Sequence, residues 1–275
     1  MPEMLSYFRL DKMPHIWCPG CGHGIILGAV IRAVDALDLD RDRVVFVSGI
    51  GCSSRATGYL NFDTLHTTHG RALAFATGVK LAKPELEVIV LTGDGDSAAI
   101  GGNHLIHAAR RNINLTTIVF NNSIYGMTSG QSSPLTPQSS FATTAPYGNV
   151  ERNFDLCELA IAAGATYVAR GTAYHTKLLI DLIKKGIQNK GFSLIEAVSQ
   201  CPTYYGRKNK QGSAVDMLRW QKEHAVPLQL VKQKGKENFP DKFVIGELFA
   251  TPAPEFTQEY TKIIEKAQGV KQSYE

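Results

Sequence analysis

The stretch GDGDSAAIGGNHLIHAARRNINLTTIVFNNSIYG, from Gly93 to Gly126, decides how this chain folds. It begins directly after the apolar run 88–91, and its Asn-Asn pair follows a second apolar run, 115–120. Short apolar runs bounded by turn residues, with a helical pattern between them, are typical of buried parallel strands. The acid Asp94 and the amide Asn122 should therefore meet where neighbouring strands end.

The same alternation continues on both sides of this stretch. We expect helices over 24–37, 70–82, 100–111, 154–163 and 175–189, and strands over 44–47, 87–91, 115–120, 166–169 and 192–198. This order predicts an α/β fold with a mostly parallel sheet and helices on both faces. We expect one α/β domain over 1–205. Residues 206–275 should form a C-terminal extension that packs on that domain or on a partner.

Composition excludes several classes of protein. The chain has 275 residues, 44% hydrophobic and 20% charged, as in ordinary globular proteins. Its net charge of +4 is scattered, which argues against nucleic-acid binding. It has no apolar run long enough to span a membrane and no secretory signal pattern, so we expect a cytoplasmic protein. Five cysteines in such a chain favour metal or redox chemistry over disulfides.

The strand ends predict a magnesium and diphosphate site. Asp94 offers a carboxylate, Asn122 an amide oxygen and Ile124 a backbone carbonyl, which are ligands that Mg²⁺ prefers. Gly93 and Gly95 allow the backbone to approach a ligand, and a helix start favours phosphate. This layout is typical of a thiamine diphosphate site. The alternatives are a tight turn with a capping aspartate and a dinucleotide site, whose acid should follow the glycines rather than separate them.

Four cysteines could reach the same edge of the sheet. Cys52 and Cys201 both follow predicted strands, whereas Cys18 and Cys21 precede the first predicted helix. Four thiolates suit a [4Fe–4S] cluster. A zinc site and a thioredoxin-like dithiol stay open as alternatives, although zinc usually takes two short Cys pairs. Cys157 lies on a predicted helix and is interpreted as a small buried hydrophobic residue.

Five ordered motifs between about Met13 and Tyr205 carry a family resemblance. The chain resembles the β subunit of 2-oxoacid:ferredoxin oxidoreductases, most closely the 2-oxoglutarate branch. The motifs are WCPGCGHG (17–24), GIGCSSR (49–55), HTTHGRALAFATGVKLA (66–82), GDGDSAAIGGNH (93–104) and NNSIYGMTSGQSSPLT (121–136).

The resemblance implies an activity and its partners. Thiamine diphosphate would decarboxylate a 2-oxoacid, coenzyme A would take the acyl group, and single electrons would pass through a [4Fe–4S] cluster to ferredoxin. The reverse reaction, reductive carboxylation, is implied as well. The family's catalytic glutamate comes from an α subunit, so we expect an (αβ)₂ assembly.

The resemblance also assigns residues. The cluster ligands would be Cys18, Cys21, Cys52 and Cys201, and the magnesium ligands Asp94, Asn122 and Ile124. Contacts to thiamine diphosphate would come from Ile50, Gly51, Cys52, Ser53, Gly95, Asp96, Gly126 and Met127.

Three further residues are expected to act on substrate or cofactor. The guanidinium of Arg55 suits the distal carboxylate of 2-oxoglutarate, although many arginines serve only at surfaces. His69 precedes a predicted helix and could bind cofactor or substrate, or cap that helix. Thr128 lies in the loop expected over the thiazolium ring.

Other classes of function are possible on the same residues. One is a cluster-free thiamine diphosphate-dependent decarboxylase or lyase, and another is a zinc-binding scaffold without activity. The family's members also include enzymes for pyruvate or for a broad range of 2-oxoacids.

Overall fold

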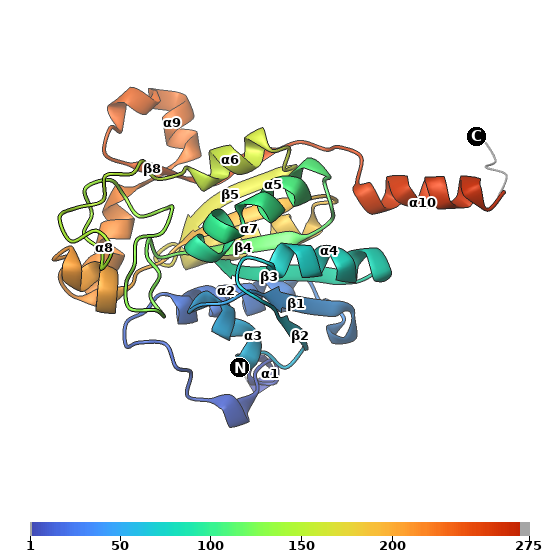
Figure 1. Ribbon diagram of the computed structural model, residues 1–275, viewed down its shortest axis with the longest axis horizontal. Helices are drawn as coiled ribbons and strands as arrows, with labels where there is room; N and C mark the ends of the chain where they lie inside the picture. Colours follow the sequence, from blue (N-terminus) through green and yellow to red (C-terminus); the bar gives the residue numbers. More distant parts are fainter. Residues whose placement is uncertain (1, 270–275) are drawn as a thin grey trace.

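A computed structural model describes residues 2–269 of the chain. The strands are β1 Val44–Ser48, β2 Asp63–His66, β3 Glu87–Gly93, β4 Thr116–Asn121, β5 Tyr167–Thr172, β6 Ser193–Val198, β7 Ala225–Pro227 and β8 Phe243–Ala250. They form one sheet in the order β2-β1-β3-β4-β6-β5-β8-β7 (Figure 1). All neighbours are parallel except β5 and β8.

Helices connect the strands. They are α1 Pro2–Leu5, α2 His23–Ala36, α3 Ala56–Tyr59, α4 Ala72–Ala82, α5 Gly102–Arg110, α6 Leu156–Ala162, α7 Thr176–Gln188, α8 Ala214–His224, α9 Leu228–Lys234 and α10 Phe256–Ala267. A π-helical turn, Asp96–Ile100, precedes α5, and a second one, Pro202–Gly206, precedes α8.

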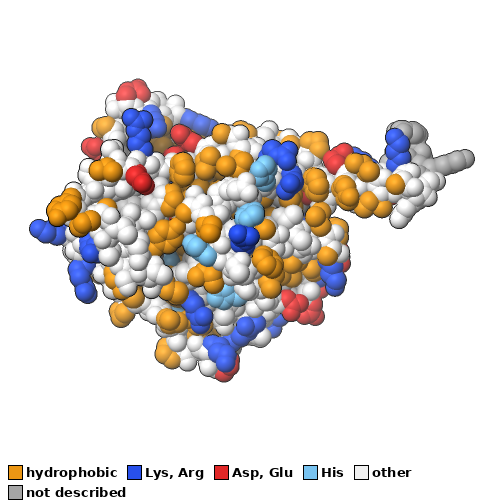
Figure 2. All heavy atoms as spheres, in the orientation of Figure 1, with side chains coloured by type: hydrophobic (Ala, Val, Ile, Leu, Met, Phe, Trp, Pro, Cys, Tyr) orange, Lys and Arg blue, Asp and Glu red, His pale blue; other side chains and the backbone are white. Residues whose placement is uncertain are grey.

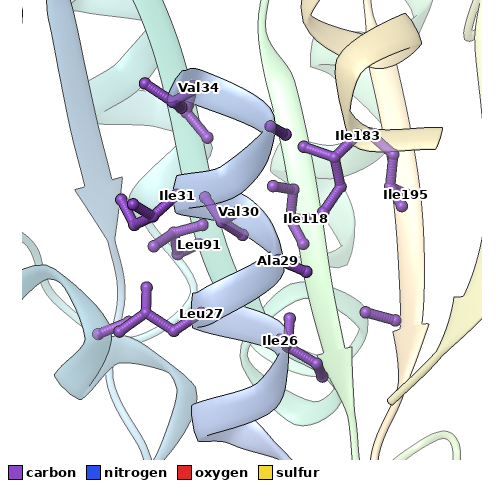
Figure 3. Close-up of a cluster of buried hydrophobic side chains, with 14 of the residues drawn as sticks. Ile26, Leu27, Ala29, Val30, Ile31, Val34, Leu91, Ile118, Ile183 and Ile195 are labelled. Carbon is purple, nitrogen blue, oxygen red and sulfur yellow. The ribbon is translucent and has the colours of Figure 1, made fainter. Parts of the chain in front are cut away.

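Side chains alternate between the two faces of the sheet, as the two-residue period of a strand requires. On β3, Ile89 and Leu91 belong to one buried cluster, whereas Val88 and Val90 belong to another. The first cluster contains α2 and α7 (Figure 3). The second contains α4, α5 and α6. Because both faces are covered, the strands are apolar on both sides rather than amphipathic.

Local sequence explains where several helices begin. The Asp155 side chain accepts hydrogen bonds from the backbone N–H groups of Cys157 and Glu158 and so caps α6. Ser213 and Asp216 form a capping box at the start of α8. These side chains therefore fix the first turn of α6, which follows β4 in the chain, and of α8, which follows β6.

The predicted α/β fold is confirmed, and the expected helices and strands lie close to their predicted bounds. Three strands were missed. β2 is half-exposed at the edge of the sheet, so it has no apolar run. β7 and β8 lie in the segment where the sequence pattern weakens.

The chain beyond residue 205 joins the same sheet. β8 pairs antiparallel with β5, and β7 pairs with β8. The helix α10 extends away from the rest of the molecule (Figure 1). Within residues 2–269, no helix is long and apolar enough to cross a membrane.

Candidate active site

The carboxyl ends of four parallel strands place the functional segments at one edge of the sheet. The loops after β1, β3, β4 and β6 all start there, because these strands run in one direction. A cavity of about 410 Å³ lies at this edge. It is lined by residues from the first three loops together with the start of α2 and the segment before α4.

Every residue predicted to contact thiamine diphosphate lines this cavity. So do the predicted magnesium ligands, His69 and Thr128. The predicted residues brought together are Ile50, Gly51, Cys52, Ser53, His69, Gly93, Asp94, Gly95, Asp96, Asn122, Ile124, Gly126, Met127 and Thr128.

Three oxygen atoms converge on the wall of the cavity. The side-chain oxygen of Asn122 lies 2.8 Å from the Ile124 carbonyl oxygen and 3.2 Å from Oδ1 of Asp94. Octahedral Mg²⁺ with bonds of about 2.1 Å separates adjacent oxygens by about 3 Å. With the amide turned, its nitrogen would donate to both neighbours. With its oxygen facing them, the three oxygens form a donor set that fits Mg²⁺.

Burial gives Asp94 an unusual protonation equilibrium. Its side chain is buried, and this desolvation raises the pKa of Asp94 to about 7. The hydroxyl of Ser133 donates to Oδ2 at 2.5 Å and opposes that rise. A divalent cation would hold the carboxylate in its charged form. Sequence reasoning missed Ser133, because nothing marks one serine in a loop rich in serine.

Asp96 organises the loops around the cavity. Its Oδ1 accepts from the backbone N–H of Gly70 at 2.7 Å and of Ile50 at 3.3 Å. Nδ1 of His69 lies 2.6 Å from the same oxygen, and the Thr92 hydroxyl donates to Oδ2 at 2.8 Å. Both carboxylate oxygens are therefore used within the chain. Asp96 acts mainly as a positioning residue, although it lines the cavity.

His69 and Thr128 are held at the cavity in different ways. Nδ1 of His69 contacts Asp96, and Nε2 has no hydrogen-bond partner among the described residues. Thr128 donates from its hydroxyl to Gln131, whose amide donates back to the Thr128 carbonyl at 2.5 Å. His69 thus keeps one ring nitrogen free for a ligand, whereas the Thr128 hydroxyl already has a partner.

A second, smaller cavity adjoins the first and contains the four predicted cluster ligands. Cys18, Cys21, Cys52 and Cys201 all line it. Gly126 lies between the last two: a Cβ at this glycine would be 3.4 Å from Sγ of Cys52 and 3.7 Å from Sγ of Cys201. Burial, together with the charges of the other three cysteines, raises the pKa of Cys21 to about 12. Such thiols lose their protons readily only to a metal.

The spacing of the sulfurs distinguishes between two metal sites. Zinc with Zn–S bonds of about 2.3 Å requires sulfurs about 3.8 Å apart. Within residues 2–269, one group of three or more His, Cys, Asp or Glu ligand atoms lies within 4.8 Å, and it consists of Asp155, Cys157 and Glu196. Among the described residues, no three of the four cysteine sulfurs therefore lie within 4.8 Å of one another, which is wider than a tetrahedral zinc site requires. Four thiolates at one cavity are the donor set that a [4Fe–4S] cluster takes.

Arg55 lies beside the cysteines rather than in the larger cavity. It lines the cysteine cavity, and its buried Nε has no hydrogen-bond partner. Its guanidinium has no ion-pair partner among the described residues. Arg55 does not line the larger cavity, so its expected contact with substrate stays a prediction.

A buried ionic network anchors the turn that carries Asn122. Arg170 donates from Nε to Glu196 at 2.7 Å and from a terminal nitrogen to Asp155 at 2.6 Å. Glu196 accepts from the Asn121 amide at 2.6 Å. The single guanidinium contacts both acids, and this ion pairing accounts for their proximity. Cys157 is buried beside it, as predicted, and donates to Glu196.

A match to a protein-family model defines the class of protein to which this chain belongs. The protein-family model described as "Thiamine pyrophosphate enzyme, C-terminal TPP binding domain" matches residues 20–197. This range includes the whole wall of the larger cavity.

Individual relatives define the family. The chain is 55% identical over 269 residues to the 2-oxoglutarate synthase subunit KorB of Methanocaldococcus jannaschii, covering 98% of this chain and 100% of the relative. It is 46% identical over 188 residues to subunit beta of the 2-oxoacid:ferredoxin oxidoreductase 2 of Aeropyrum pernix, covering 68% and 61%. The chain belongs to the β subunits of the 2-oxoacid:ferredoxin oxidoreductases, and is thus part of a multi-subunit enzyme.

A solved structure with a similar fold supports this family assignment. It is described as "2-oxoglutarate:ferredoxin oxidoreductase from Magnetococcus marinus with 2-oxoglutarate, coenzyme A and succinyl-CoA bound". The TM-score is 0.86 at 35% identity, and the match covers 99% of this chain and 92% of that chain. The family predicted from the five motifs is confirmed.

Proposed function

We propose that this chain holds thiamine diphosphate, Mg²⁺ and a [4Fe–4S] cluster in a 2-oxoglutarate:ferredoxin oxidoreductase. In the oxidative direction, 2-oxoglutarate and coenzyme A yield succinyl-CoA, carbon dioxide and a proton. Two electrons leave one at a time, each reducing one ferredoxin. The reductive carboxylation is the same reaction reversed.

The observation that carries this proposal is the shared wall of the two cavities. Cys52, Asn122, Gly126 and Met127 line both of them. Cys52 would bind the cluster while its neighbours Ile50 and Gly51 contact thiamine diphosphate. A single short loop would therefore touch both groups, which supports direct electron transfer between them.

Residues of this chain would bind and orient rather than react. Asp94, Asn122 and the Ile124 carbonyl would hold Mg²⁺, and the ion would hold the diphosphate. Bound thiamine diphosphate supplies the electron sink for decarboxylation. Asp96 fixes the loops before α3 and α4 around it, and the Tyr125 hydroxyl donates to the Gly95 carbonyl at 3.1 Å.

A partner chain would complete the site. The cavity lining includes Asp94 and Asp96 but no glutamate among the described residues. Apolar side chains are also exposed on the elements that follow cavity-lining segments in the chain: Phe75 on α4 is 46% exposed, and Ile100 before α5 is 55% exposed. These features support an α subunit that covers this face and contributes the catalytic glutamate. Hydrophobic side chains of this kind are visible on the surface in Figure 2.

Anaerobic co-purification with the partner chain tests the proposal. We expect stoichiometric iron, sulfide and thiamine diphosphate, together with visible absorption from iron–sulfide charge transfer. A panel of 2-oxoacids should show 2-oxoglutarate as the preferred substrate over pyruvate. A colourless but fully active preparation would favour a cluster-free lyase, and zinc without iron would favour a scaffold.

A further inference from the structure

One edge of the cysteine cavity reaches the molecular surface. Cys18 is exposed and Ile16 beside it is 62% exposed, whereas Cys201 is buried. A cluster held by these sulfurs would therefore face solvent on the Cys18 side. This inference rests on the proposed function, and it concerns where electrons leave the chain.

The segments around that edge carry no carboxylate. Neither an Asp nor a Glu occurs in residues 13–34, 44–62, 123–150 or 197–215. These four segments supply nearly all of the lining of the cysteine cavity. The four segments themselves therefore add no repulsion toward a negatively charged partner, and Asp216, which directly follows the last of them, is ion-paired with Arg219.

The same rim presents a cluster of cations. Arg207, Lys208 and Lys210 are exposed, and none of them has an ion-pair partner among the described residues. Figure 2 shows basic side chains at the left edge of the molecule, where α8 and the loops around it lie in Figure 1. Exposed cations without partners leave their positive potential available to another molecule.

Backbone contacts hold these cations close to the cysteines. The backbone N–H of Gly206 donates to the Cys201 carbonyl at 2.9 Å, which places Arg207 one turn from that ligand. On the other side, Gly20 of the Cys-Pro-Gly-Cys loop packs so closely on Ala214 that a Cβ would lie 2.4 Å from the alanine Cβ. The segment that carries the cations is thus tied at one end to Cys201 and at the other to the Cys-Pro-Gly-Cys loop.

An exposed aromatic residue completes the surface. The Asn209 amide donates to the Phe141 carbonyl at 3.0 Å, and its oxygen accepts from the Phe141 N–H at 2.7 Å. Phe141 is 45% exposed. Asn209 thus ties Phe141 to the cationic segment, and an exposed apolar side chain beside positive charges has the composition of a weak, transient interface.

We propose that Arg207, Lys208 and Lys210, with Phe141, Ile16 and the edge of Cys18, form the docking surface for ferredoxin. The partner that this surface fits is a small acidic protein that carries one electron. Charge complementarity would steer it to the side of the cluster site where Cys18 is exposed.

Charge reversal in the assembled holoenzyme tests this surface. The variant Arg207→Glu/Lys208→Glu is compared with Lys83→Glu/Arg111→Glu, which carries the same charge change at exposed positions before β3 and β4, at the opposite edge of the sheet. We expect the second-order rate of ferredoxin reduction to fall at least about tenfold in the first variant, with a weaker dependence on salt. Reduction of methyl viologen with 2-oxoglutarate and coenzyme A should be unchanged in both.

The proposed docking surface would be overturned if the second-order rate of ferredoxin reduction were unchanged in the first variant, or if both variants lost it equally. Loss of α-subunit binding by the first variant alone would also overturn it, because the cations would then belong to the subunit interface. Wild-type holoenzyme that fails to reduce methyl viologen would contradict the proposed function itself.

Discussion

At the scale of single residues, the proposed Mg²⁺ site depends on Asn122, whose side-chain amide lies beside both the Ile124 carbonyl and Asp94. We expect Asn122→Ala to weaken Mg²⁺-dependent binding of thiamine diphosphate at least about tenfold, because one of three oxygen ligands is lost. Calorimetric titration of the cofactor at several Mg²⁺ concentrations measures this. The exposed Asn103→Ala on α5 serves as the control. Equal Mg²⁺ dependence in the two variants would place the ion elsewhere.

Arg55 has a positive charge and no partner within the described residues, so its partner should be an external anion. If it binds the distal carboxylate of 2-oxoglutarate, Arg55→Ala should raise the KM for 2-oxoglutarate far more than the KM for pyruvate. Steady-state kinetics on both substrates measures the ratio. Equal KM changes, accompanied by a shifted reduction potential of the cluster, would assign Arg55 to the cluster.

Single residues were predictable where chemistry restricts the residue type. Asp94, Asn122 and the four cysteines stand out in the sequence because few side chains bind hard cations or iron. Ser133 and the bonds of Asp96 were not predictable. They depend on contacts between segments up to 46 positions apart, which spacing does not reveal.

At the scale of elements, the buried network around Arg170 connects β5, β6 and the end of β4. Arg170→Ala would leave Glu196 buried without its countercharge, so we expect the free energy of unfolding to fall by about 3–5 kcal/mol. Lys185→Ala removes a cation from an exposed ion pair with Glu247 and should cost no more than about 1 kcal/mol. Urea unfolding of both variants tests the contrast, and similar small losses would show that the network contributes little.

Elements were predictable where periodicity and burial agree. α2, α7 and the central strands carry unbroken apolar patterns, because each is buried against a helix layer or a sheet. β2 and β8 contain exposed or half-exposed positions and are strands only because β1 and β5 offer them partners. Pairing of this kind is a tertiary effect that a local pattern does not contain.

At the scale of the whole molecule, the chain brings two cavities together, and the larger one contains no glutamate among the described residues. We therefore expect the isolated chain to bind Mg²⁺ and thiamine diphosphate without turning over 2-oxoglutarate. Adding the α subunit should restore dye-linked activity. Turnover by the isolated chain would mean that its own residues complete the site.

The most direct test is a crystal structure of the anaerobically prepared holoenzyme, with anomalous diffraction recorded at the iron absorption edge. We predict iron density among Cys18, Cys21, Cys52 and Cys201, and diphosphate density beside Asp94 and Asn122 of the same chain. Cysteine sulfurs without iron, or thiamine diphosphate bound away from the loop of Cys52, would contradict the claim that one loop contacts both groups and so allows electron transfer between them.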